Sequence, residues 1–482
     1  MTATQIVDVG RVVEAAADAA SPWGAMPPEE RAAVLSAIAD ALDAEQAELV
    51  ALADAETHLG PSRLGGELRR TTFQLRLFAR EVRAGGFHDV RIDEADQAWP
   101  SGPRPELRRY RTAVGPVLVF AASNFPFAFS VAGGDTASAW AAGCPVVVKA
   151  HPGHPRLSRH TARIIGKAIA DADAPDGLFG LIEGEQAGVE ALRHPLIRAA
   201  AFTGSQRGGL ALARIAAERP VPIPFYGELG SVNPVVVTPG AAEARGEQIA
   251  HGYVASLTQG AGQFCTNPGL LFLPAGHVII DHITELLRQA PTSPLLNDRI
   301  AEAYLATARR LAAHPDVRKL CWPDDQASLA PRLLGVPLGA FRAQQATLAE
   351  ECFGPLGLLV SYDDLAEVPA VVAALPGQLT TTVHAEEAEV VDTPALTEVL
   401  ADRGGRVLWG GWPTGVAVTH AMHHGGPFPA TTAPSTTSVG TAALERFLRP
   451  VTYQSWPHHL LPPPLRDDNP WRVPQRIHRA AE

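Results

Sequence analysis

A cysteine stands in a sequence context that suits covalent chemistry. Cys265 lies in residues 263–268 (QFCTNP), between polar and turn-forming residues and after the small residues 260–262. A nucleophilic cysteine needs partial access and a route to the thiolate, because a free thiol titrates near pH ~8.5. A buried structural cysteine is the alternative, and we expect that role for the other three, Cys144, Cys321 and Cys352.

Two polar residues at the ends of expected strands suit proton transfer and oxyanion binding. Glu228, in residues 226–234 (YGELGSVNP), follows an apolar run and precedes a glycine turn. A carboxylate at a strand end of an α/β sheet faces the ligand crevice, where it could accept a proton from water. Asn124, in residues 120–126 (FAASNFP), could donate its amide to a developing oxyanion. A surface glutamate and a turn asparagine are the alternatives.

Two further motifs contain glycine. Residues 202–209 (FTGSQRGG) lie at an expected strand-to-helix junction, where backbone N–H groups can hold phosphate. The motif does not match the dinucleotide-binding pattern GxGxxG, so this turn alone is weak evidence for a phosphate-binding site. Residues 350–355 (EECFGP) could equally form a turn with solvated acids.

The elements that would position these residues follow an α/β pattern. The first 60 residues and residues 69–82 are expected to be helical, and residues 99–112 resemble a projecting, extended arm. Short apolar runs then alternate with helical stretches, which predicts a buried parallel sheet covered on both faces. The expected strands are 117–122, 145–148, 179–182, 199–202 and 221–226, and the helices lie near 134–142, 158–172, 186–193 and 208–217. A second α/β region runs from about 231 to 416, its first strand at 235–237, and the tail from 447 is expected to be extended and irregular.

Composition and charge exclude several classes of protein. The 482 residues suffice for two or three domains, and with a net charge of −11 and no Lys/Arg cluster we expect no nucleic-acid or anionic-membrane partner. No secretory signal is visible, and the most apolar region, 131–148, is interrupted by Asp135, Gly143 and Pro145. The cysteine spacing matches no disulfide framework, so reduced thiols in a cytoplasm are expected.

Histidines do not indicate a metal site. The groups are His151/His154, His420/His423/His424 and His458/His459, and none has a Cys or acidic partner at ligand spacing. We expect solvated or packed histidines and no metal.

Taken together and in this order, the motifs around Cys265, Glu228, Asn124, 202–209 and 350–355 resemble the aldehyde dehydrogenase superfamily from about residue 10 onward. The stretches 123–155, 262–269 and 420–450 are similar to its subgroup of 2,5-dioxovalerate (α-ketoglutaric semialdehyde) dehydrogenases and a related bacterial fatty-aldehyde dehydrogenase. The resemblance implies an α/β fold with a Rossmann-type cofactor domain, an α/β catalytic domain and an oligomerisation arm. The cofactor domain would comprise 1–98 and 113–230, the catalytic domain 231–430, and the arm 99–112 and 440–482. The resemblance also implies a homodimer or homotetramer.

The resemblance also implies a mechanism. The Cys265 thiolate would attack the aldehyde, Asn124 and the Cys265 N–H would hold the oxyanion, and Glu228 would deprotonate the water that hydrolyses a thioester. Acylating dehydrogenases and phosphate-linked reductases of similar architecture generally lack this glutamate, so hydrolysis is favoured. A catalytically inactive structural relative is the remaining alternative, although both residues are intact.

The expected cofactor is NADP⁺, with NAD⁺ possible. NAD-using members carry a glutamate three residues after the lysine that ends the second strand, whereas Pro152 stands three residues after Lys149 here. The group that would repel a 2′-phosphate is absent, and Lys149 and His151 could donate to that phosphate. The other expected cofactor residues are Gly204, Ser205, Gly209, Leu229, Glu351 and Phe353.

The expected substrate is 2,5-dioxovalerate. Arg70 and Gln74 lie four residues apart on one helix face and are candidate anchors for its carboxylate, although a solvated face is the alternative. The rival substrate is a long aliphatic aldehyde, for which the tunnel would be lined by Phe125, Phe127, Phe129, Phe264 and Phe428.

Overall fold

The chain begins with four helices. The computed structural model describes residues 8–391 and 394–479. Asp8 caps the first helix by accepting from the Arg11 N–H, and Gly85 ends the fourth in the left-handed conformation. The helices are α1 (Val9–Ala25), α2 (Pro28–Ala44), α3 (Gln46–Thr57) and α4 (Pro61–Ala84), which confirms the predicted helices from residue 9 onward; residues 1–7 lie outside the described residues.

The first α/β unit contains a five-stranded parallel sheet in the order β5-β4-β3-β6-β7. Its strands are β3 (Val117–Phe120), β4 (Val146–Lys149), β5 (Phe179–Ile182), β6 (Ala199–Thr203) and β7 (Phe225–Glu228). Its helices are α5 (Gly134–Ala142), α6 (Pro155–Asp171), α7 (Glu185–Arg193) and α8 (Gln206–Ala217). The last strand begins at Phe225 rather than at the expected residue 221, because residues 221–224 form no ladder. Glu228 is therefore the final residue of β7, at the carboxyl edge of the sheet.

The second α/β unit contains a seven-stranded sheet in the order β10-β11-β12-β9-β8-β13-β14. All neighbours run parallel except β10 and β11. Its strands are β8 (Val235–Val237), β9 (Leu270–Pro274), β10 (Arg318–Cys321), β11 (Arg332–Pro337), β12 (Leu356–Tyr362), β13 (Gln378–His384) and β14 (Gly404–Trp409). Its helices are α9 (Pro239–Thr258), α10 (Ile279–Gln289), α11 (Asp298–Ala312), α12 (Leu338–Ala343), α13 (Gln345–Leu348), α14 (Val368–Ala373), α15 (Glu387–Val391) and α16 (Pro394–Arg403).

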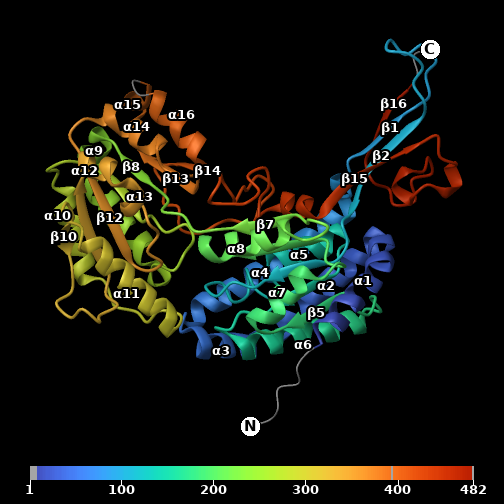
Figure 1. Cartoon of the computed structure of the whole chain (residues 1–482), viewed down its shortest axis with the longest axis horizontal. Helices are drawn as coiled ribbons and strands as arrows, with labels where there is room; N and C mark the ends of the chain where they lie inside the picture. The colour runs from blue at the N-terminus through green and yellow to red at the C-terminus, as the bar shows by residue number, and fades with distance from the viewer. Residues whose placement is uncertain (1–7, 392–393, 480–482) are drawn as a thin grey trace, which may run out of the picture.

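A four-stranded sheet forms an arm that projects from the rest of the molecule (Figure 1). Its order is β15-β2-β1-β16, from β1 (Val90–Asp93), β2 (Leu107–Ala113), β15 (Leu448–Gln454) and β16 (Gln475–His478). The expectation of an irregular tail is wrong, because β15 pairs antiparallel with β2 and β16 pairs parallel with β1. These partners lie more than 300 residues away in the chain, so no local pattern shows them.

Short 3-10 turns connect several of these elements, at Gly86–His88, Gln259–Gly262, Leu365–Glu367, Thr441–Phe447, His458–Leu460 and Pro463–Leu465. Among the described residues, no helix has the length and apolar character needed to cross a membrane.

Candidate active site

Three side chains from distant parts of the chain meet at Cys265. The cysteine follows the turn Gln259–Gly262, Glu228 ends β7, and His424 lies in the loop after β14. The Cys265 Sγ lies 3.6 Å from His424 Nε2, which lies 2.9 Å from Glu228 Oε1. The Ser438 hydroxyl donates to the other Glu228 oxygen. Glu228 is 4% exposed and His424 is 1% exposed, so water does not screen this cluster.

The surroundings push Cys265 and Glu228 toward opposite protonation states. Burial and the nearby Glu228 carboxylate raise the pKa of the Cys265 thiol well above its usual range. Burial alone would raise the pKa of Glu228, but His424, Ser438 and the Cys265 thiol together hold it below its usual value. The cluster therefore holds a protonated thiol against an ionised carboxylate, which is an arrangement suited to proton transfer.

Hydrogen bonds from two asparagine side chains hold the cysteine loop in place. The Asn233 amide donates to the carbonyls of Cys265 (2.8 Å) and Asn267 (2.9 Å). The Asn267 amide in turn donates to Gly262 (2.8 Å) and Gly354 (3.1 Å). The motifs around residues 231–234 and 350–355 thus position Cys265 through backbone contacts, a role that their spacing in the sequence does not reveal.

Asn124 lies against the same loop. The Asn124 side-chain amide donates to the Gln263 backbone carbonyl at 3.0 Å. The Asn124 backbone carbonyl accepts from Arg63 Nη2 at 2.7 Å. The Arg63 guanidinium lies 5.2 Å from the Phe125 ring and 5.1 Å from the Phe264 ring. The structure therefore brings the expected oxyanion donor beside the cysteine loop, with its amide bonded to that loop.

Helix α4 presents a polar face to the site. Arg70 lies on this face, whereas the alternative role expected for it was a solvated surface residue. Arg70 lies over the Phe129 ring at 5.5 Å, and its Nη2 donates to the Val416 carbonyl at 3.5 Å. Burial lowers the pKa of Arg70, while the charges of Glu67, Glu228 and Cys265 raise it. Arg70 is therefore within electrostatic reach of Glu228 and Cys265.

Gln74 is buried one turn farther along α4, where its amide nitrogen packs against Gly134. Glu67 lies one turn before Arg70, and its Oε1 accepts from the backbone N–H groups of Phe127 (2.8 Å) and Ala128 (2.9 Å). Glu67 thus fixes the loop after Asn124, whereas none of the described contacts joins Gln74 to the cysteine cluster.

Three of the expected tunnel phenylalanines form a cluster. The Phe125 ring lies 5.1 Å from Phe264 and 5.5 Å from Phe129, and Phe129 lies 6.4 Å from the His424 ring. The other two do not join it. Phe127 is only 2% exposed and packs in the core with α4 and α5, and Phe428 is 60% exposed with no ring contact among the described residues. No described ring contact joins either side chain to this cluster, and their place in a substrate tunnel stays a prediction.

Basic side chains gather after β4. Burial lowers the pKa of Lys149, with Glu185 opposing this shift and Arg299 adding to it. Burial together with His154, Lys149 and Arg299 lowers the pKa of His151 to about 3. Helix α11 abuts this loop, since Asn297 Nδ2 lies 3.7 Å from where a Gly153 Cβ would be. Arg299, which the sequence motifs do not indicate, therefore approaches Lys149 and His151 from the second α/β unit.

The glycine-containing turns pack against one another. Ser205 caps α8 by accepting from the Gly208 N–H at 3.3 Å, and Gly204 beside it is exposed. A Cβ at Gly209 would lie 2.2 Å from Leu229 Cδ2, so these two expected cofactor residues are in direct contact. A side chain at position 209 would require the Leu229 side chain to move.

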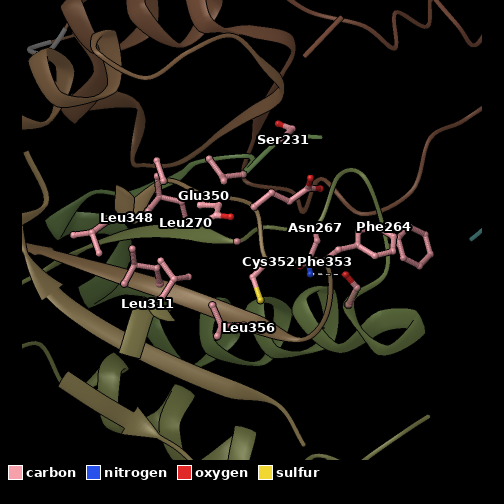
Figure 2. Close-up of a pocket in the computed structure, with 16 residues that line it drawn as sticks. Ser231, Phe264, Asn267, Leu270, Leu311, Leu348, Glu350, Cys352, Phe353 and Leu356 are labelled. Atoms are coloured by element: carbon pink, nitrogen blue, oxygen red, sulfur yellow. Dashed lines mark hydrogen bonds between the residues drawn. The ribbon is translucent and has the colours of Figure 1, made fainter. Parts of the chain in front are cut away.

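Glu351 lies over the glycine that follows Leu229. A Cβ at Gly230 would stand 1.9 Å from Glu351 Oε2. Burial raises the pKa of Glu351 to about 7, against a hydrogen bond from the Ser231 backbone. Both Glu351 and Phe353 line a pocket beneath the cysteine loop, together with Ser231 and Asn267 (Figure 2).

We expected the histidines to be solvated or packed, without Cys or acidic partners. That expectation is wrong for His424, which contacts both Cys265 and Glu228. The ligand-type atoms of Glu228, Cys265 and His424 lie within 4.8 Å of one another. Such a group has the composition of a metal site as well as of an acid–base cluster. The absence of a metal stays a prediction. The sequence shows His424 only as one of three histidines in HAMHH, with nothing to indicate which reaches the cysteine.

Comparison with known proteins agrees with this geometry. The sequence profile described as "Aldehyde dehydrogenase family" matches residues 1–308. The chain is 48% identical to Alpha-ketoglutaric semialdehyde dehydrogenase 2 of Azospirillum brasilense, over 97% of this chain and 90% of that protein. It is 42% identical to Alpha-ketoglutaric semialdehyde dehydrogenase of Acinetobacter baylyi, over 98% and 90%. Aldehyde dehydrogenase 21 of Physcomitrella patens, solved with succinate, shares the fold with a TM-score of 0.79 at 19% identity, over 93% and 90%.

Proposed function

The chain belongs to the aldehyde dehydrogenase family and is an oxidoreductase acting on aldehydes, and from that premise we propose that it oxidises 2,5-dioxovalerate to 2-oxoglutarate with NADP⁺. The observation that carries the proposal is the cluster of Cys265, Glu228 and His424, in which a thiol, a carboxylate and an imidazole converge. We infer that the reaction passes through a thioester on Cys265.

The first step is activation of the thiol. The Cys265 proton passes to the adjacent Glu228 carboxylate, which His424 and Ser438 keep ionised. The thiolate then attacks the aldehyde carbon, and the oxyanion is held by the Cys265 N–H and the Asn124 amide. To bind the oxyanion, the Asn124 side-chain amide gives up its hydrogen bond to the Gln263 carbonyl and donates to the substrate oxygen instead. A bound nicotinamide would supply the hydride acceptor that makes oxidation to the thioester possible.

The second half of the reaction hydrolyses the thioester. Glu228 first releases the thiol proton to solvent and is again a carboxylate. It then accepts a proton from water, and the hydroxide attacks the thioester carbon to release the carboxylate product and the Cys265 thiolate. Because the pKa of Glu228 is held below its usual value, the carboxylate is available as a base at neutral pH. A base beside the cysteine favours hydrolysis over transfer of the acyl group to another carrier, and it argues against an inactive relative.

The substrate proposal is supported by the two α-ketoglutaric semialdehyde dehydrogenases and by Arg70, a half-buried cation near Cys265. A long aliphatic aldehyde is the second candidate, favoured by the cluster of Phe125, Phe129 and Phe264. The test is kcat/KM for 2,5-dioxovalerate, a short aldehyde and decanal. We expect 2,5-dioxovalerate to be preferred, and a more than tenfold preference for decanal would replace the proposal with the fatty-aldehyde assignment.

The cofactor proposal rests on charge at the end of β4. Lys149 forms no ion pair with any described residue, and His151 and Arg299 lie near it. These groups fit a 2′-phosphate, and Pro152 adds no carboxylate that would repel one. The turn at Gly204, Ser205 and Gly209, with Leu229, Glu351 and Phe353, would hold the remainder of the cofactor. Steady-state constants for both cofactors at saturating aldehyde test this, and a clear preference for NAD⁺ would contradict it.

The arm supports a proposal on assembly. We infer a homodimer or homotetramer in the cytoplasm, in which residues 99–112 and 440–482 bridge subunits beside a cofactor domain (1–98 and 113–230) and a catalytic domain (231–430). The exposed side chains of Trp99, Trp456 and Ile477 on or near the arm supply apolar surface for such a contact. Light scattering of the purified protein tests it, and a monomer at micromolar concentration would contradict it.

A further inference from the structure

Two guanidinium groups from opposite ends of the chain hold one loop beside the active site. Arg70 on α4 donates Nη2 to the carbonyl of Val416 at 3.5 Å. Arg406 on β14 donates Nη1 to the carbonyl of Gly415 at 3.0 Å and Nη2 to that of Pro413. Residues 413–416, which we call the anchor loop, are therefore bonded by both arginines. The two cations converge on one short segment, although they are 336 residues apart in the sequence.

The register of the seven-stranded sheet places Arg406 on the side of the cysteine. Thr380 on β13 pairs with Arg406 on β14. The Thr380 hydroxyl donates to Asn233 Oδ1 at 2.9 Å, and the Asn233 amide donates to the Cys265 carbonyl at 2.8 Å. Paired residues on neighbouring strands project to the same face of a sheet. Arg406 therefore lies on the face that supports the catalytic loop.

The preceding residue of β14 gives a second geometric link. A Cβ at Gly405 would lie 2.0 Å from the carbonyl oxygen of Gly425, so the β14 backbone packs directly on the residue after His424. His424 Nε2 is 3.6 Å from Cys265 Sγ. β14 therefore abuts the loop that carries His424, through a position whose Cβ would point to the face opposite Arg406.

Each of these two arginines has one N–H group for which the described residues supply no hydrogen-bond acceptor. Arg70 Nη1 and Arg406 Nε are buried and have no hydrogen-bond partner among the described residues. Neither side chain forms an ion pair within the part of the chain that the structure describes. Burial lowers the pKa of each arginine, and the charge of ionised Cys265 raises it in both cases. Both side chains are half-buried, and an anion at this place would give their unpartnered donors an acceptor.

We propose that Arg406 is a substrate-specificity residue that, together with Arg70, binds the 2-oxo-carboxylate end of the semialdehyde while its aldehyde carbon lies at Cys265. The inference rests on the proposed function and deepens it. A planar 2-oxo acid presents neighbouring oxygens, which match the fixed fork of N–H donors on a guanidinium. The bonds to the anchor loop hold each guanidinium in place, and Arg70 Nη1 and Arg406 Nε have no partner among the described residues.

The test uses three aldehydes of equal chain length and three Arg406 variants. The substrates are 2,5-dioxovalerate, 5-oxopentanoate, which lacks the 2-oxo group, and pentanal, which also lacks the carboxylate. For Arg406→Gln, which keeps donors for the anchor loop but loses the charge, kcat/KM should fall about 10- to 100-fold with both acids. With pentanal it should stay within about threefold. Arg406→Lys should recover part of the activity with acids, and Arg406→Ala should lose most.

Arg403→Gln is the matched control. Arg403 ends α16 three residues earlier and also donates to a backbone carbonyl, that of Leu375 at 3.2 Å. It makes no described contact with the anchor loop, so its variant should treat all three aldehydes as the unchanged enzyme does. If Arg406 only holds the anchor loop, Arg406→Gln will resemble the unchanged enzyme and Arg406→Ala will lose activity equally with all three aldehydes. Either result overturns the inference.

A binding measurement separates this inference from the proposed function. Calorimetry with 2-oxoglutarate should show a loss of affinity of about tenfold or more in Arg406→Gln and in Arg70→Gln, with a smaller additional loss in the double variant because both residues serve one ligand. Unchanged affinity in Arg406→Gln overturns the inference alone. If the unchanged enzyme prefers pentanal or decanal over both acids, the proposed substrate fails, and the inference fails with it.

Discussion

Replacing His424 with asparagine separates the chemistry of the cluster from its packing. His424 Nε2 lies 2.9 Å from Glu228 Oε1, and the contact is buried from water. It is one of the groups that hold the pKa of Glu228 below its usual value against the effect of burial. Asparagine is shorter and does not reproduce this contact, so burial will dominate. The pKa of Glu228 should therefore rise in the variant.

The size of the effect follows from the contact that is lost. A hydrogen bond to a charged group contributes about 1.5–3 kcal/mol, and one pH unit corresponds to about 1.4 kcal/mol. The acidic side of the pH–rate profile should therefore move upward by about one to two pH units. A base whose pKa is lowered stays active as pH falls toward that value, so the unchanged enzyme should keep its rate at pH 5.5, where the variant loses it.

The assay is kcat as a function of pH between 5 and 8 at saturating aldehyde and cofactor, with circular dichroism to confirm folding at each pH. His423→Asn is the control, since His423 is the neighbouring half-buried histidine and makes no described contact with Glu228. Its profile should match that of the unchanged enzyme. If His424→Asn is folded and its profile does not move, the coupling of His424 to Glu228 that we derive from their geometry is refuted.

Further predictions concern the chemical steps, the cofactor and stability. Cys265→Ala should give neither a covalent adduct nor reduced cofactor in rapid mixing, whereas Glu228→Ala should give a slowed burst of reduced cofactor, because the thiol loses its proton acceptor, followed by little turnover. Absence of that burst would mean that Glu228 is indispensable for activating the thiol and that His424 does not replace it. Pro152→Glu should weaken binding of 2′,5′-ADP, which carries the 2′-phosphate, while ADP binding is retained; equal loss of both in calorimetry would indicate a misshapen loop instead. Arg446→Met should lower the free energy of unfolding by about 3–5 kcal/mol in urea titrations, because the buried Asp135 carboxylate then loses the guanidinium 2.7 Å away. A change below about 1 kcal/mol would show that Asp135 is accommodated without its partner.

The local patterns of the sequence were sufficient for much of the fold. Continuous apolar runs such as residues 146–148 predicted buried parallel strands, and the helix expected at residues 69–82 lies within α4. These features depend on residues within a few positions of one another, since a strand buried on both faces has no polar side. The order of Asn124, Glu228 and Cys265 at expected strand ends and loops likewise indicated a family and a chemistry before any contact was known.

Only the tertiary structure decided which other residues reach that chemistry. His424 lies 159 residues from Cys265, and β15 pairs with β2 from the far end of the chain. Arg406 is half-buried on a strand whose pattern alone does not separate a surface cation from one facing the cysteine. Hydrophobic periodicity specifies that a residue is buried but not against which partner, because burial is non-directional. Hydrogen bonds and charges do select partners, but they act over a few ångströms and only after the chain has folded.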